Sequence, residues 1–319
     1  MRDRPLLLGS LIVVAAASGF GVLGPLARFG YDAGLDPVSF VAWRAIFAAL
    51  VIALVIAVRS RRGHPFRNPW RLPVRDRAAI LVVGLSGLAL NVAMFVAFGV
   101  TSIAVALLAF YTYPAIVAAV AAVLGHERLD ATRLAALGLA LAGMVLVVGG
   151  GLVSESNVTV HPLGVVLGLA AAGGQTVFVT VSRSSFRSLP PEQAMGWIVL
   201  VTAIGCTLLS LITGGPFGVV FQRADAIAFA VVAGTIGAGI PSVLFLVGIR
   251  AIGGTRAGIL MLFEPLVGVT LAALLLREAV TPIQAIGGAA ILAAALLVQR
   301  SAGPVDARSP AVVASVEHG

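Results

Sequence analysis

Charged residues, cysteine and lysine are scarce in this sequence. Only 11% of the 319 residues are charged, and none of the 21 basic residues is a lysine. Because a soluble domain carries about 25% charged residues, this composition excludes an ordinary water-exposed surface. The single cysteine, Cys206, lies within an apolar run, which excludes an intramolecular disulfide and a CxxC metal or redox site.

Long hydrophobic runs dominate what remains. Hydrophobic residues make up 60% of the chain and the mean hydropathy is +1.08. The runs are about 20 residues long, the length at which a helix crosses roughly 30 Å of hydrocarbon. They lack the alternation of a membrane β-barrel, so helices remain as the way to satisfy the backbone in lipid. The sequence therefore predicts an all-α membrane protein with ten transmembrane helices, at residues 6–30, 38–58, 77–98, 103–124, 133–150, 162–182, 194–214, 225–248, 255–276 and 281–299.

The arginines predict the orientation of these spans. Most of them lie in alternate loops, together with the ends of the chain, and basic loops face the cytoplasm. We therefore expect a multi-pass protein of the bacterial cytoplasmic (inner) membrane with both termini cytoplasmic. The first run is expected to be retained and not cleaved as a signal peptide, and residues 301–319 to form a disordered tail. The net charge of +8 follows from this topology, so no nucleic-acid partner is expected.

The two halves of the chain resemble each other. Aligning Tyr113-Pro114 with Glu264-Pro265 also aligns Glu127 with Glu278, because each glutamate follows its proline by 13 residues. Residues 1–150 and 151–300 are thus predicted to be two repeats of five spans each. Since five is odd, the second repeat lies inverted in the membrane, an arrangement that supplies two nearly equivalent packings for alternating access.

Two motifs in these halves resemble a known family. The segment 110–114 (FYTYP) and the segment 262–265 (LFEP), each followed at the end of its span by a glutamate, are similar to the two repeats of the EamA family in the drug/metabolite transporter superfamily. The resemblance covers roughly residues 6–299 and implies transport of a small organic solute. In the second half, Trp197 occupies the position that Arg44 has in the first, so the two repeats are not exactly symmetric there, although both still resemble the family.

Glu264 and Arg44 are the charged candidates for a substrate or proton site. Glu264 lies about ten residues into its span, near the midplane, where a charge costs at least about 2.5 kcal/mol unless it meets a cavity or a partner. It could exchange a proton, anchor an ammonium group, or simply hold the bundle together. Arg44 either snorkels outward or faces inward and binds Glu264 or a substrate carboxylate. The inward alternative predicts that both line one cavity.

Neutral polar residues deep in the spans are secondary candidates. Interhelical hydrogen bonding explains such residues in most cases, and contact with the solute is the alternative. Tyr113 is of particular interest because it is the counterpart of Glu264 in the repeat. These residues are Asn91, Tyr111, Tyr113, Gln175, Thr176 and Ser242.

Four prolines lie inside spans, at Pro25, Pro114, Pro241 and Pro265. A proline removes one backbone donor and frees a carbonyl, which at membrane depth is tolerated beside protein or a wet cavity. Each therefore either shapes its helix or acts as a hinge. The matched positions of Pro114 and Pro265 favour the hinge.

Glu127 and Glu278 end equivalent spans on opposite sides of the predicted bundle. Each is next to a basic residue, so capping or a surface ion pair explains them, and a pair of gates is the functional alternative. The glycine-rich fifth and tenth spans allow close helix approach and are candidate scaffold or homodimer faces.

No nucleophile with a base, metal cluster or phosphate-binding loop is apparent, so neither an enzyme nor a cofactor is expected. We predict a secondary active transporter that exports an amino acid or a similar small polar metabolite by alternating access, with proton exchange as a candidate driving force. Its partners are the small-molecule substrate and the lipid bilayer. The alternative is a translocator of lipid-linked or hydrophobic compounds, of flippase or multidrug type, with a lateral apolar opening and few buried polar groups. A purely structural membrane protein would show no flux.

Overall fold

The computed structural model describes residues 4–101, 103–125, 130–152, 160–186, 188–276 and 280–300, and every regular element in these ranges is helical. Nine segments there are long and apolar enough to cross a membrane, and a shorter apolar helix, Pro282–Val298, follows them. These segments coincide with the spans expected from the sequence. The prediction of an all-α, multi-pass membrane fold is therefore confirmed.

The helices follow one another with short connections. In chain order they are α1 (Arg4–Gly21), α2 (Leu23–Asp32), α3 (Pro37–Arg61), η1 (Pro69–Arg71), α4 (Val74–Val100), α5 (Ile103–Phe110), α6 (Tyr113–Val123), α7 (Ala131–Leu152), α8 (Pro162–Ser184), α9 (Pro191–Ile212), η2 (Phe217–Phe221), α10 (Ala224–Gly234), η3 (Thr235–Gly239), α11 (Ile240–Ile252), α12 (Gly254–Met261), α13 (Phe263–Leu276) and α14 (Pro282–Arg300).

Four spans are interrupted within the membrane. They consist of α1 with α2, α5 with α6, α10 with η3 and α11, and α12 with α13. In each, a helix resumes with a proline among its first three residues: Pro25, Pro114, Pro241 and Pro265. Proline is tolerated in the first turn of a helix but restricts the residue before it, so the break falls there. The break in the eighth span is a π-helical segment, Thr235–Gly239.

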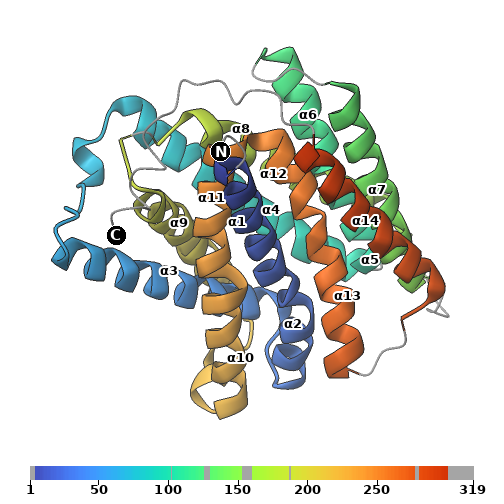
Figure 1. Ribbon diagram of the computed structural model, residues 1–319. Helices are drawn as coiled ribbons and strands as arrows, with labels where there is room; N and C mark the ends of the chain where they lie inside the picture. The colour runs from blue at the N-terminus through green and yellow to red at the C-terminus, as the bar shows by residue number, and fades with distance from the viewer. Residues whose placement is uncertain are drawn as a thin grey trace.

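The packing follows the repeat. Helix α3 packs against α9, α7 against α14 and α6 against α12, and each pair joins equivalent spans of the two halves. Likewise α1 packs against α11 as α4 packs against α8. Figure 1 shows α7 beside α14 and shows that α1 begins at the same end of the bundle at which α14 finishes. The structure is therefore two inverted five-helix repeats that interleave.

Helices α7 and α14 approach each other most closely at a pair of glycines. A Cβ atom added to Gly143 would lie 2.6 Å from the backbone oxygen of Gly287, and one added to Gly287 would lie 2.6 Å from that of Gly143. Neither backbone can move without separating the helices, so both positions require glycine. By contrast, a Cβ at Gly138 in the same helix meets nothing within 4 Å.

We expect Gly143→Ala to lower the thermal stability of the protein in detergent, because overpacking a close helix contact costs roughly 1–3 kcal/mol. Gly138→Ala, which adds the same methyl group to open space, is the matched control and should leave the melting temperature unchanged or slightly raised. Fluorescence-detected size-exclusion chromatography after heating measures both. Equal melting curves for the two variants would contradict the tight contact at Gly143.

Candidate functional site

A cavity of about 310 Å³ lies between the two repeats. Its walls come from both halves and include all four interrupted spans, whereas none of its lining residues comes from α7 or α14. The lining residues are Phe20, Leu23, Arg44, Ala45, Ala48, Gly87, Leu90, Asn91, Met94, Leu107, Phe110, Tyr111, Gln175, Phe178, Met195, Ile198, Val199, Thr202, Ala238, Ser242, Phe245, Met261 and Glu264. The lining of the cavity is thus polar at a few residues and apolar elsewhere.

Glu264 reaches the cavity from a helix break. It is the second residue of α13, directly after the interruption at Leu262, so its carboxyl group lies in the first turn of that helix. The backbone N–H groups of a first turn favour a negative charge. Tyr111, which lies in the matching break between α5 and α6, lines the cavity as well, and its hydroxyl interacts with the same carboxyl group. The two equivalent breaks therefore jointly build this part of the site.

Arg44 reaches the cavity from α3 and is oriented by an asparagine. Its Nη2 donates to Oδ1 of Asn91 at 2.9 Å, and Nδ2 of Asn91 donates to the backbone oxygen of Gly87 at 2.7 Å. The Nε–H of Arg44 is buried and has no hydrogen-bond partner in the described part of the chain. Because a guanidinium carries five N–H donors, the group retains capacity to bind an anion.

The two charges attract each other across the cavity. Among the described residues, no ion pair within 4 Å joins Arg44 directly to Glu264. Their side chains thus line the same cavity without a direct ion pair between them.

The other predicted residues divide into two groups. Asn91, Tyr111, Gln175 and Ser242 line the cavity with Arg44 and Glu264. Tyr113 does not line it: its side chain is buried behind the wall, with its ring 5.3 Å from that of Phe110.

The remaining predicted residues do not line the cavity in the described part of the chain. Thr176 is outside the lining, and its hydroxyl donates to the backbone oxygen of Ala172 at 2.8 Å. Glu127 and Glu278, predicted as gates, lie outside the described residues.

Sequence reasoning missed most of the apolar wall. Phe20, Phe110, Phe178 and Phe245 line the cavity, but an aromatic residue inside an apolar run gives no sign of which way it faces. Thr202 was missed as well, although a hydroxyl deep in the seventh span is a signal of the kind that identified Gln175 and Ser242.

Packed helices and a polar network lie at the arginine-rich end of the bundle. Every residue of α12 is buried. The carboxylate of Asp76, in the first turn of α4, accepts from the backbone N–H groups of Phe186 (3.0 Å) and Ser188 (3.3 Å) and from the Ser188 hydroxyl. Arg250 of α11 donates to the backbone oxygens of Phe186 (3.0 Å) and Leu189 (3.2 Å). An acid and a base therefore hold the α8–α9 connection between them.

The same connection holds Phe186 in an unusual backbone conformation. Its φ is 61°, in the left-handed region that a bulky residue rarely adopts, and its side chain is fully buried. Such a conformation persists where surrounding contacts over-determine it. The hydrogen bonds on both sides of Phe186 supply these contacts.

Aromatic contacts lie at the opposite end. The ring of Trp43 stacks on Phe217 with centroids 4.6 Å apart and meets Phe221 edge-on at 5.3 Å. Its Nε1 donates to the backbone oxygen of Phe217 at 2.9 Å. The contacts at the two ends of the repeat structure are therefore of different kinds.

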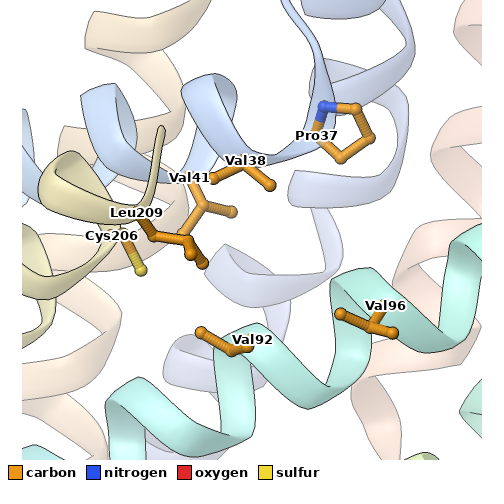
Figure 2. Close-up of a pocket in the computed structure, with 7 residues that line it drawn as sticks. All are labelled: Pro37, Val38, Val41, Val92, Val96, Cys206 and Leu209. Atoms are coloured by element: carbon orange, nitrogen blue, oxygen red, sulfur yellow. The ribbon is translucent and has the colours of Figure 1, made fainter. Parts of the chain in front are cut away.

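A second, smaller pocket of about 140 Å³ lies between α3, α4 and α9. Figure 2 shows its side chains, which are aliphatic except for the sulfur of Cys206: Pro37, Val38, Val41, Val92, Val96, Cys206 and Leu209. The pocket and the cavity share a stretch of α4, because Val92, which lines the pocket, directly follows Asn91, which lines the cavity.

Comparison with known proteins identifies a matching family model, a relative and a solved structure of similar fold. The model of the EamA-like transporter family matches residues 7–149 and 162–300. An uncharacterized transporter of Archaeoglobus fulgidus is 29% identical over 280 residues, which span 88% of this chain and 93% of that protein. One solved crystal structure superposes with a TM-score of 0.77 at 21% identity, over 91% of this chain and 95% of that one, which shows a shared fold.

We expect Asp76→Asn to loosen the α8–α9 connection, because a hydrogen bond to a charged acceptor contributes roughly 1.5–3 kcal/mol. The amides of Phe186 and Ser188 should exchange with deuterium at least about tenfold faster. Asp225→Asn, at a half-exposed acid in the first turn of α10, is the control and should leave them unchanged. Unchanged exchange in Asp76→Asn would show that the carboxylate does not hold this connection.

Proposed function

The chain belongs to the EamA-like transporter family, and from this premise we propose that it is a secondary active exporter of an amino acid or a similar small polar metabolite. The observation that carries the proposal is the placement of Arg44 and Glu264 at separate points of one cavity. A solute with a carboxylate and an ammonium group offers the complementary pair of charges.

The geometry supports binding of both charged groups of such a solute, its carboxylate and its ammonium group. A guanidinium binds a carboxylate with two parallel hydrogen bonds. In Arg44, Nη2 donates to Asn91, whereas the Nε–H has no hydrogen-bond partner in the described part of the chain. Glu264, with the Tyr111 hydroxyl beside it, is the acceptor for an ammonium group. The cavity volume of about 310 Å³ is at the small end of ligand pockets, which suits a metabolite of this size.

Glu264 also supports proton exchange as the driving force. A charged carboxylate deep in a membrane is costly, so the group is best neutralised either by a proton or by the ammonium group of the solute. If the two compete for one carboxylate, a proton from outside replaces the solute as the solute leaves on that side, and the proton is released inside, where the next solute binds. Export against a gradient then draws its energy from the proton gradient.

The interrupted spans support alternating access around this site. Glu264 and Tyr111 lie in the matching breaks of the two repeats, so a change of angle at either break moves a binding group. Inverted repeats can exchange their packings, which would open the cavity to one side and then to the other. Pro114 and Pro265, next to these breaks, are the proposed hinges, and Pro25 and Pro241 hold the corresponding positions in the other two interrupted spans.

One observation favours a second function, translocation of a lipid-linked or hydrophobic compound. The apolar pocket of Figure 2 would accommodate an alkyl chain next to the polar cavity. The charged and amide groups of the cavity weigh against it, because a purely apolar compound would leave Arg44 and Glu264 without partners.

We expect Glu264→Gln to weaken counterflow of amino acids in proteoliposomes by about 30-fold or more, since removing one partner of a buried charge pair costs about 2–5 kcal/mol. Wild-type counterflow should weaken as the pH is lowered, because protons compete with the ammonium group, and the variant should lose this pH dependence. Asp225→Asn is the control for expression and insertion. Scrambling of a fluorescent lipid without amino-acid counterflow would favour the second function.

We expect Arg44→Lys to act selectively on solutes that have a carboxylate, because lysine lacks the planar fork of arginine. Counterflow of an amino acid should fall at least about tenfold, whereas transport of the amine without that carboxylate should change little. Competition assays with the amino acid, its amine and its deaminated acid separate the roles of Arg44 and Glu264. Equal losses for all three compounds would contradict the two-point recognition.

A further inference from the structure

The connection between α3 and α4, which we call the arginine segment (residues 61–75), exposes an uncompensated positive charge. Two acidic residues near it are buried and bound elsewhere. Asp76 accepts from the backbone N–H groups of Phe186 and Ser188, and Glu192 pairs with Arg59 at 3.1 Å. Neither therefore neutralises the segment. The exposed arginines of the segment are Arg61, Arg62, Arg67, Arg71 and Arg75.

Large apolar side chains are exposed among these arginines. Trp70 is 80% exposed, Val74 is 71% exposed and Phe66 is 49% exposed. The short helix η1 (Pro69–Arg71) presents Trp70, and Asn68 fixes its start by accepting from the Trp70 backbone N–H at 2.9 Å. Tryptophan beside basic residues is typical of the headgroup region of a bilayer, where one part of the ring is apolar and the other polar.

The arginine segment is held in place against α9. Gln193 accepts from the backbone N–H of Arg67 at 3.0 Å and donates to the backbone oxygen of Pro65 at 3.2 Å. The ring of Phe66 lies 6.1 Å from that of Trp197, and Leu72 is buried. In Figure 1 the segment lies at the left edge, beyond the end of α3. It is thus an anchored surface of fixed shape.

We propose that the arginine segment is a binding surface for the headgroups of anionic phospholipids. It joins two membrane-spanning helices, so it lies at the membrane surface, and exposed arginines there attract phosphate and carboxylate groups. Trp70 and Phe66 insert at headgroup level between the bound lipids. This proposal does not depend on the solute that the cavity carries.

Trp70 itself can report the lipid next to it. The chain has three tryptophans, so the double variant Trp43→Phe, Trp197→Phe leaves Trp70 as the sole fluorophore. In liposomes with equal fractions of brominated lipid, brominated phosphatidylglycerol should quench Trp70 more strongly than brominated phosphatidylcholine. The difference should shrink in high salt, because exposed charges are screened.

Substitution of the arginines tests the cause of this preference. Arg67→Gln, Arg71→Gln and Arg75→Gln together should reduce the preference for the anionic lipid by at least about tenfold. The same three positions changed to lysine retain the charge and should retain most of the preference. Equal quenching by the two lipids, or a preference unaffected by the glutamine variant, would overturn the proposal.

A second measurement needs no change at Trp43, which packs in the aromatic cluster at the opposite end. Native mass spectrometry of the otherwise unaltered chain counts the phosphatidylglycerol and phosphatidylcholine molecules that stay bound. We expect the anionic lipid to be retained by the wild-type and lysine chains and lost from the glutamine chain. Equal retention by all three chains would count against the arginine segment as the binding surface.

Discussion

A carboxylate and a guanidinium held at mid-depth in hydrocarbon are costly, and this cost organises the structure. Neither Glu264 nor Arg44 could remain charged against lipid, so each requires polar partners or water. Tyr111 and Asn91 supply the partners, and a cavity between the repeats supplies the space. The break before α13 serves the same need, because the first turn of a resumed helix is where backbone N–H groups stabilise a buried acid.

The two repeats are alike in packing but not in chemistry. Equivalent spans pair with each other across the bundle, as α7 does with α14. The contacts at the two ends differ: Asp76 and Arg250 hold the α8–α9 connection with charge-assisted hydrogen bonds, whereas stacked aromatic rings surround Trp43 at the other end.

Local signals in the sequence predicted much of this. The length of the apolar runs located the spans, the prolines located the breaks, and Glu264 and Arg44 were identified because charges are rare at that depth. Tyr113 was chosen by its repeat position, yet it lies behind the cavity wall. Asp76 and Arg250 were missed because charges near the ends of spans were interpreted as markers of topology alone.

By itself, the sequence determined the class of protein, the number and inversion of its repeats and the position of each polar group along its span, since all of these depend on position along the chain. Only the tertiary structure decided which side chains share the cavity. A helix that is apolar all round gives no periodic signal for its rotation, because lipid and the protein interior accept the same residues. Which face of α3 and which face of α13 turn toward the cavity is set by packing between distant spans, and that packing brings Arg44 and Glu264 to one cavity.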